Sequence, residues 1–440
     1  MPYPSVLDTD VCLLGAGPHA LAAAVHLRRA RPGLRLITVD PSGAWLTTWH
    51  DQMARAEITT LRSPVVHHPS PDPAGLAHHV RAHRLASSGL PYEVPTTEAF
   101  TSFCTELIEG YGLDAPVAAR TRSIVPGPRP RIEAGRYEIH ADRVVVATNP
   151  HRRVVPDWVW PLLGRRSGLF AHAAELDLAR LPDLDGERVV VVGGGLSAAH
   201  LACGAVRHGA RVQLVTRRPL QVRNFDTDPG WLGPRCLRAF DADPDPAGRL
   251  RRAREARGGG SVPPWMHDRL DELVARGDLT IRDPSPVRTA SVEPGGSCRL
   301  ALADHTTVIA DRVWLATGTA PDISAARYLE PLVADQPVVG GLPVVGDDLR
   351  LGSFPVYVMG RLATLTLGPA AGNLWGAQRA ARRITYAVTG VDLGVDTLAA
   401  PPPPPPRAAP HPASHLVRPA PGDPPAGPDE AVMTDAASRH

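Results

Sequence analysis

The sequence predicts an α/β fold built on two parallel β-α-β units, because one three-part pattern occurs twice. In each copy a short apolar strand, Val11–Leu14 or Val189–Val192, leads into a glycine-rich turn, and an alanine-rich helical stretch follows. A second strand completes each unit, over residues 34–39 in the first copy and 211–216 in the second. Strand, turn and helix in this order, within about 30 residues, are typical of a parallel sheet with crossover helices.

The two glycine-rich turns carry the first indication of function. They read Gly15-Ala-Gly17-Pro18-His-Ala20 and Gly193-Gly-Gly195-Leu-Ser197-Ala198. The first glycine permits the tight turn, the second lets the backbone approach a pyrophosphate, and the small third residue lets the helix pack on the strand. Each helix N-terminus then presents N–H groups and a positive dipole end to phosphate. One such turn is weak evidence, but two predict two Rossmann-like domains that each bind a dinucleotide.

The residues that end the second strand of each unit distinguish the two nucleotides. Asp40 ends the first, and its carboxylate would bond ribose hydroxyls and repel a 2′-phosphate, which favours FAD. The second ends in Thr216-Arg217-Arg218, and two guanidiniums there match a 2′-phosphate and favour NADPH over NADH. A second interpretation of Arg217 and Arg218, as solvated residues after a strand, stays open.

Composition excludes several classes of function. The chain has 440 residues and a net charge of +2, so we expect neither a nucleic-acid nor an anionic-membrane partner. All 47 of its basic residues are arginine, which excludes Schiff-base lysines and a lysine-bearing P-loop. The five cysteines form no Cys-x-x-Cys pair, so a disulfide framework or a structural zinc site is not expected. With no visible export signal, these features favour the cytoplasm.

The rest of the chain alternates between regular elements and loops. Further helices are expected over residues 97–109, 266–276 and 372–388, and further strands over 137–140, 143–147, 313–316 and 356–359. Residues 258–264 are a loop by composition. Residues 398–440 contain six consecutive prolines and cannot build a core, so they are expected to form a disordered tail.

Several segments between these elements match the motifs of one group of flavoproteins. They are Trp49-His50-Asp-Gln-Met53, Thr60-Leu-Arg62-Ser-Pro64, Pro95-Thr-Thr97-Glu-Ala-Phe100, and the strand ends Ala147-Thr148 and Ala316-Thr317. Together with both glycine turns, they resemble the flavoprotein monooxygenases, and above all the N-hydroxylating branch of ornithine and lysine N-monooxygenases. The likeness extends over residues 10 to about 390. The chain differs from the branch at Thr97, Asn149 and Gly360-Arg361, and it lacks lysine. These differences weaken the inference that its substrate resembles ornithine.

The resemblance implies an NADPH-binding domain inserted into an FAD-binding domain. The corresponding divisions are 1–180 and 313–397 for the FAD-binding domain, 181–312 for the NADPH-binding domain with a helical insertion over 224–278, and 398–440 for the tail. The implied activity is NADPH-dependent oxygenation of a small nucleophilic substrate by O₂ through a flavin C4a-hydroperoxide, with N-hydroxylation of an amine as the first expectation.

The resemblance also assigns roles to residues outside the two turns. Trp49, His50 and Met53 would form a wall against the flavin, and Asn224 would lie on the substrate side. Gly318, Gly368 and Gly372 would approach the cofactors, and His172 would help to position one of them. Simple core packing of Trp49 and Met53, a satisfied polar role for His50, a linker role for His172 and an ordinary loop-to-helix junction at Gly368–Gly372 remain alternatives.

Other functions stay open beside amine oxygenation. An enzyme of the same fold could attack sulfur or a ketone, and a flavin-binding regulator would not turn over at all. A disulfide reductase is disfavoured because no cysteine pair could relay electrons. The pairs His67-His68 and His78-His79 have no Cys or acidic residue at ligand spacing, so no metal site is expected.

Overall fold

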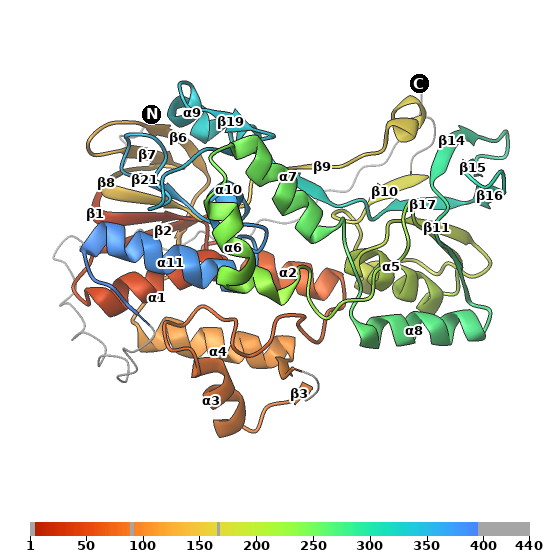
Figure 1. The fold of residues 1–440 in the computed structure, drawn as a ribbon, viewed down its shortest axis with the longest axis horizontal. Helices are drawn as coiled ribbons and strands as arrows, with labels where there is room; N and C mark the ends of the chain where they lie inside the picture. The colour runs from red at the N-terminus through yellow and green to blue at the C-terminus, as the bar shows by residue number, and fades with distance from the viewer. Residues whose placement is uncertain (1–4, 89–91, 165–167, 395–440) are drawn as a thin grey trace, which may run out of the picture. The chain divides into compact units, whose positions relative to one another are not determined.

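The computed structural model describes residues 5–88, 92–164 and 168–394, so the predicted tail lies outside the described residues. Two sheets with parallel strands at their centres dominate this part of the chain, as Figure 1 shows, and the first also has antiparallel strands at one side. This confirms the predicted α/β class with two Rossmann-like sheets. None of the described helices combines the length and the apolar character that a membrane span requires.

The first sheet contains the first glycine turn. Its described strands run in the order β5-β2-β1-β8-β7-β6, with β21 paired to β8. Strands β5, β2, β1, β8 and β21 are mutually parallel, so their carboxyl ends lie along one edge. The bounds are β1 Ser5–Leu14, β2 Leu36–Asp40, β5 Val117–Ala118, β6 Thr121–Val125, β7 Arg131–Ala134, β8 Tyr137–Val146 and β21 Val356–Val358.

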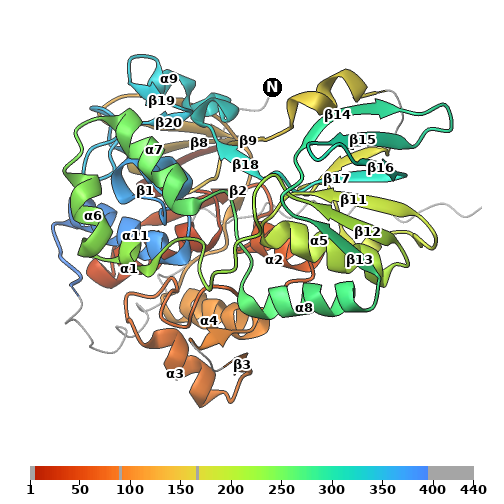
Figure 2. The ribbon, with the colours of Figure 1, turned by 45° about the vertical axis from the view of Figure 1, so that its right-hand side comes forward.

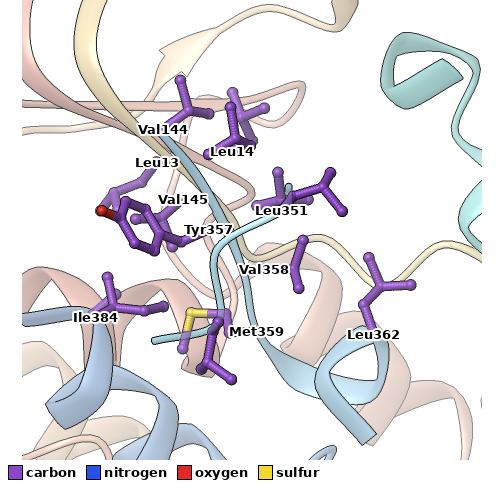
Figure 3. Close-up of a cluster of buried hydrophobic side chains, with 14 of the residues drawn as sticks. Leu13, Leu14, Val144, Val145, Leu351, Tyr357, Val358, Met359, Leu362 and Ile384 are labelled. Atoms are coloured by element: carbon purple, nitrogen blue, oxygen red, sulfur yellow. The ribbon is translucent and has the colours of Figure 1, made fainter. Parts of the chain in front are cut away.

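Helices α1 (Pro18–Ala30) and α11 (Leu374–Thr389) lie side by side along this sheet. They contact through Ala22, Ala377 and Ala381, which are fully buried. Small side chains at such a contact let two helices approach closely, which explains the alanine-rich sequence of both. Figure 3 shows the core above them, where side chains of β1, β8 and β21 meet Ile384 of α11.

The second sheet contains the second glycine turn. Its described strands are all parallel, in the order β10-β17-β11-β12-β13. Helices α5 and α8 lie on one face, and the antiparallel strands β14, β15 and β16 lie on the other (Figure 2). The bounds are β10 Phe170–His172, β11 Arg188–Val192, β12 Arg211–Val215, β13 Leu279–Arg282, β14 Val287–Val292, β15 Cys298–Leu302, β16 Thr307–Ala310, β17 Arg312–Leu315, α5 Leu196–Arg207 and α8 Pro264–Ala275.

A two-stranded ladder joins the segments that run between the two sheets. Strand β9 (His151–Arg153) follows β8, and β18 (Thr319–Pro321) follows β17. The two pair antiparallel. The two Ala-Thr strand ends, Ala147-Thr148 and Ala316-Thr317, therefore begin the two segments that run between the sheets. Small ladders elsewhere are β3 Ser87–Ser88 with β4 Val94–Pro95, and β19 Val338–Val339 with β20 Leu342–Pro343.

The segment after the first unit contains more helix than the sequence analysis expected. Helix α4 (Thr97–Gly110) was expected, whereas α2 (Thr47–Arg55) and α3 (Gly75–Ala82) were not. Leu76, Val80, Phe100 and Phe103 form their shared core. The short helices in the rest of the described chain are η1 Asp157–Leu162, η2 Leu178–Arg180, η3 Pro229–Leu232, η4 Ile323–Ala325, η5 Arg327–Leu329, η6 Gly360–Ala363, α9 Glu330–Val333 and α10 Thr364–Leu367.

Helices α6 (Pro234–Asp241) and α7 (Pro246–Arg257) lie within residues 224–278, the segment expected as a helical insertion, and neither had been located individually from the sequence. Asp245 caps α7 by accepting from the backbone N–H groups of Ala247 and Gly248. Helix α7 contacts the core of the first sheet through Leu250, and its Arg249 donates to the Leu365 carbonyl. Leu237 of α6 lies beside Gly368, in the loop before α11. The division of the chain into domains stays a prediction. Helices α6 and α7 lie against the loop before α11 and the core of the first sheet, respectively.

Candidate functional site

The first glycine turn lies at the carboxyl end of β1 and leaves open space in front of α1. Gly15 has a φ of 96°, and a Cβ there would lie 3.2 Å from Cγ2 of Thr148, so the position requires glycine. Around Gly17, no atom of the described residues lies within 4 Å of where a Cβ would be. Gly17 is the N-cap of α1, and no side chain caps the first turn of this helix. The backbone N–H groups of that first turn therefore face the open space.

Asp40 is held directly beside this turn. Its Oδ2 accepts from the backbone N–H of Ala16 at 3.1 Å, and its Oδ1 accepts from the backbone N–H and hydroxyl of Ser42 at 2.9 and 2.7 Å. The carboxylate is therefore oriented by backbone at the end of β2. Oδ2 accepts only one hydrogen bond and so retains acceptor capacity, and the arrangement fits a ribose that carries free hydroxyls.

Helix α2, with the predicted flavin-side residues, is anchored to the same turn. The backbone N–H of Leu46 donates to the carbonyl of Ala16 at 2.8 Å, and Leu46 then caps α2 in the left-handed conformation, at φ 64°. Such a φ is rare for a non-glycine residue and marks a locally constrained junction. No sequence pattern predicted this left-handed conformation at Leu46.

The side chains of α2 also contact helix α4. The Trp49 and Phe100 rings lie 5.0 Å apart, and Nε2 of His50 lies 3.3 Å from the Thr101 hydroxyl. Trp49 and Met53 are half-buried against the core that α3 and α4 share. Core contact of Trp49 and Met53 is thus observed, and their contact with flavin stays a prediction.

The second glycine turn repeats this geometry at the carboxyl end of β11. Gly193 has a φ of 152°, and a Cβ there would collide with the carbonyl oxygen of Ala316. Gly195 caps α5 without a side-chain hydrogen bond, and Ser197 is exposed in the first turn of that helix. The loop Gly258–Gly260 lies against this turn, since a Cβ on Gly260 would be 3.1 Å from Cα of Gly195.

Arg217 and Arg218 are exposed at the end of β12, beside the second turn. The turn that carries them is held by Asp283, whose Oδ1 accepts from the Thr216 hydroxyl at 2.9 Å and whose Oδ2 accepts from the Leu220 N–H at 2.7 Å. Within the described part of the chain, neither guanidinium forms an ion pair. Two charges without anionic partners at this strand end fit a 2′-phosphate.

Arg62 joins the segment after α2 to the chain that leaves the second glycine unit. Its Nε donates to the Asn224 carbonyl at 2.9 Å, and its Nη2 donates to the Arg223 carbonyl at 2.7 Å. Nη1 donates to Asp226 at 2.6 Å, and two further bonds reach the carbonyl and hydroxyl of Ser261 at 3.1 and 2.8 Å. Burial lowers the pKa of Arg62 below its usual range. The predicted Asn224 is therefore fixed through its backbone.

The network continues to the loop that opens α11. Arg257 donates to Oδ2 of Asp226 at 3.2 Å and to the Pro369 carbonyl at 3.1 Å. On the other side of this loop, Nε2 of His19 in α1 lies 3.3 Å from the Ala371 carbonyl. The starts of α1 and α11 are thereby connected directly.

Arg361, where the sequence departs from the motifs that it resembles, is anchored to β18. Its guanidinium donates to the Thr319 hydroxyl at 2.7 Å and to the Thr319 carbonyl at 2.5 Å. Burial lowers the pKa of Arg361 to about 10. A Cβ on Gly372 would overlap the Arg361 side chain, and one on Gly368 would lie 3.1 Å from Leu237. Packing therefore accounts for both glycines, and their predicted cofactor contact remains a prediction.

Gly318 and His172 meet where the chain passes between the sheets. Nε2 of His172 lies 3.1 Å from the Gly318 carbonyl, and burial lowers the pKa of the imidazole. Gly318 itself has a φ of 80° and is exposed. His172 therefore holds the turn after β17, and a role for it in positioning a cofactor stays a prediction.

The structure gives His79 an acidic neighbour that its sequence spacing did not indicate. The spacing of His78-His79 gave no acidic partner, yet Glu106 of α4 lies beside His79, with Nδ1 and Oε2 2.5 Å apart. The two residues are far apart in sequence and meet because α3 packs on α4. No periodicity within α3 could have indicated this.

Comparison with known proteins places the chain in a family. The family model described as pyridine nucleotide-disulphide oxidoreductase matches residues 9–230, half of the chain. The chain belongs to this family. The match includes both glycine turns and both strand ends described above, Asp40 and Arg217-Arg218.

Individual members and solved structures give the same fold. Indole-3-pyruvate monooxygenase YUCCA1 of Oryza sativa subsp. japonica is 26% identical over 219 residues, and the match spans 48% of each chain, so about half of that relative. The cadaverine monooxygenase DfoA of Erwinia amylovora, solved with FAD, has a TM-score of 0.71 and 16% identity over 91% of this chain and 99% of its own. The Kutzneria sp. 744 ornithine N-hydroxylase KtzI has a TM-score of 0.69 and 17% identity over 87% and 99%. The predicted likeness to the N-hydroxylating branch is confirmed for the fold.

Proposed function

We propose that this chain is an FAD-dependent, NADPH-using monooxygenase that oxygenates a small nucleophile, with N-hydroxylation of an amine as its reaction. One observation carries the proposal. Two glycine turns lie at the carboxyl ends of parallel strands in separate sheets, and the first is followed by Asp40 and the second by Arg217-Arg218. The two turns therefore suit two different dinucleotides in one chain.

FAD would occupy the first turn. The N–H groups at the start of α1 would bind its pyrophosphate, and the absence of a side chain at Gly17 leaves the space that this contact needs. Asp40 would accept hydrogen bonds from the ribose. The start of α11 would approach the ring end of the cofactor, since His19 links it to the start of α1.

NADPH would occupy the second turn. The N–H groups at the start of α5 would bind its pyrophosphate, and Arg217 and Arg218 would bind the 2′-phosphate. The loop Gly258–Gly260 would border the pyrophosphate. Its glycines leave room for backbone contact, and Arg62 holds the neighbouring Ser261 in place.

Bound FAD and NADPH would supply hydride transfer and the activation of O₂ for oxygen transfer. The chain has to orient the reacting groups and exclude water from them. Trp49 and Met53 would provide an apolar wall, positioned by α4 and by the Leu46 junction. His50 would donate or accept one hydrogen bond at the flavin edge, opposite the nitrogen that faces Thr101. Asn224 would contribute to the substrate side.

The nature of the similar proteins supports oxygenation of an amine. DfoA is a cadaverine monooxygenase solved with FAD, and KtzI is an ornithine N-hydroxylase solved with reduced FAD, NADP⁺ and L-ornithine. YUCCA1 is a monooxygenase of indole-3-pyruvate, which keeps ketone or sulfur oxygenation as the alternative within the same class.

Disulfide reduction, the reaction in the family's name, is disfavoured by the cysteines. All five are free, and only Cys236 is not buried. Burial raises the pKa of Cys12 to about 12 and that of Cys298 to about 11, so neither thiol is a ready thiolate. A reductase of this kind needs a pair of thiols that exchange electrons with the flavin.

The test is to purify the protein, record its flavin absorption, and follow the oxidation of NADPH and NADH with panels of amines, thioethers and ketones. The proposal expects a yellow protein, faster oxidation of NADPH than of NADH, and hydroxylated product from an amine. A protein that cannot take up FAD would overturn it. Hydrogen peroxide as the only product with every substrate would instead support an oxidase or a regulator.

A further inference from the structure

A cluster of three metal-ligating side chains lies between α3 and α4, outside the two nucleotide sites. His79 and His83 belong to α3 and its C-terminal end, and Glu106 belongs to α4. Their ligand atoms all lie within 4.8 Å of one another. His79 is buried, whereas His83 and Glu106 expose 56% and 61% of their side chains.

The helices bring these groups together by simple periodicity. His79 and His83 are four residues apart, so both imidazoles project from one side of α3. Ser102 and Glu106 have the same spacing on α4. Because Leu76 and Val80 of α3 pack with Phe103 of α4, these two sides face each other.

His79 and Glu106 form a hydrogen bond without an ion, and a small separation of the two would make the distances compatible with a shared cation. Nδ1 of His79 lies 2.5 Å from Oε2 of Glu106, and Nε2 of His83 lies 3.7 Å from the same oxygen. The second distance is too long for a hydrogen bond. Ligand atoms that each lie about 2.1 Å from a tetrahedral Zn²⁺ are about 3.4 Å apart, between the two observed values.

The second nitrogen of His79 is also arranged as a metal ligand requires. Nε2 of His79 lies 3.1 Å from the hydroxyl of Ser102. A ligating histidine almost always has such a partner on its other nitrogen, which fixes the ring and the tautomer. The His79 and His83 rings are 4.4 Å apart, so the exposed His83 ring can turn toward an ion held by His79.

We propose that His79, His83 and Glu106 form a Zn²⁺ site with three protein ligands and a fourth position open to solvent. Two imidazoles and a carboxylate are ligands that Zn²⁺ accepts, and binding would replace the proton shared by His79 and Glu106. The ion would tie the end of α3 to α4. Helix α4 carries Phe100 and Thr101, which contact Trp49 and His50, so the site would stabilise the support of the proposed flavin wall.

The test is isothermal titration calorimetry of ZnCl₂ into the tag-free, chelator-treated full chain. We expect one site per chain that is weakened at least about 100-fold in His83→Ala and in Glu106→Gln, and about tenfold in Ser102→Ala. Because His83 and Glu106 are mostly exposed, these variants should keep the wild-type circular dichroism. His78→Ala is the matched control, since His78 lies on the same helix, is exposed and does not belong to the cluster.

The second measurement is the melting temperature with and without ZnCl₂. Zinc should raise it in the wild type and in His78→Ala, and should leave it unchanged in the double variant of His83→Ala with Glu106→Gln. A wild type that binds no Zn²⁺ would overturn the proposal. So would equal Zn²⁺ affinity in the wild type and the double variant, because the ion would then bind elsewhere in the chain. Neither result depends on whether the chain oxygenates an amine.

Discussion

Nη1 of Arg62 donates a hydrogen bond to Oδ1 of Asp226 at 2.6 Å. Arg62 comes from the segment after α2, and Asp226 comes from the chain that follows the second glycine unit. The Arg62 side chain is 12% exposed and that of Asp226 is 34% exposed, so this pair is shielded more than most ion pairs of the chain. All the N–H groups of Arg62 find acceptors, which makes it the main polar connection between the two segments.

Replacing Arg62 with methionine should lower the free energy of unfolding by about 2 to 4 kcal/mol, because carbonyl groups and a carboxylate would lose their donors. Arg129→Met is the matched control. Arg129 pairs with Asp8 and Asp142 at the exposed surface, where loss of an arginine should cost less than about 1 kcal/mol. Urea denaturation of both variants measures the difference, and equal shifts of the midpoint would argue against a connecting role for Arg62.

The substitution Gly17→Ala separates cofactor binding from folding. Gly17 has a φ of −81°, which alanine adopts freely, and the space beside it is open, so we expect a folded protein of unchanged stability. A bound pyrophosphate would meet the new methyl group, and FAD affinity should fall by about 10- to 100-fold. Flavin fluorescence titration measures the affinity. Gly33→Ala, also in open space, should bind FAD like the wild type, and unchanged binding in Gly17→Ala would remove FAD from the first turn.

Neutralising Arg217 and Arg218 together with glutamine should raise the KM for NADPH by at least about 100-fold, since each lost bond to a charged group is worth about 1.5 to 3 kcal/mol. The KM for NADH should not change, because NADH has no 2′-phosphate. Arg211→Gln, at the opposite end of β12, should leave both values unaltered. Steady-state kinetics with both nucleotides provide the comparison. Equal effects on NADPH and NADH would assign the two arginines to the solvated surface.

Buried histidines should make the fold sensitive to mild acid. Burial lowers the pKa of His26 to about 3 and those of His68 and His200 to about 4, against 6.5 in the unfolded chain. The unfolded state therefore binds more protons as the pH falls below about 6.5, and stability decreases toward pH 4 by up to about 1.4 kcal/mol per pH unit for each histidine. Urea unfolding at several pH values should show this slope. The slope should be smaller in His26→Leu, and an identical slope would show that His26 does not contribute.

The sequence was sufficient to predict both β-α-β units. The apolar strand before Gly15, the alanine-rich helix after it and Asp40 at the next strand end are all local signals, and the structure has β1, α1 and β2 at these places. The same holds for β11, α5 and β12. Parallel order then follows from the crossover helices, which is why the edge of each sheet that carries its candidate site could also be predicted.

Contacts between distant segments were not predictable in this way. Arg62 stood within a recognised motif, but its partners Asp226 and Ser261 lie in a segment with no regular pattern. Leu46 adopts a left-handed conformation that no leucine prefers, so only the surrounding structure determines it. Helix α7 is different, because its local signals were present in Asp245 as N-cap, Pro246 at the first position and Gly258 after the end.

The incorporation of isotopically heavy O₂ tests the central claim most directly. The FAD-loaded protein is mixed with NADPH, labelled O₂ and the panel of amines, and the masses of the products are measured by mass spectrometry. The account predicts one labelled oxygen atom on the nitrogen of an amine, formed in proportion to the NADPH consumed and much more slowly with NADH. Consumption of NADPH with no label in any product, or no reduction of the flavin by NADPH at all, would contradict it.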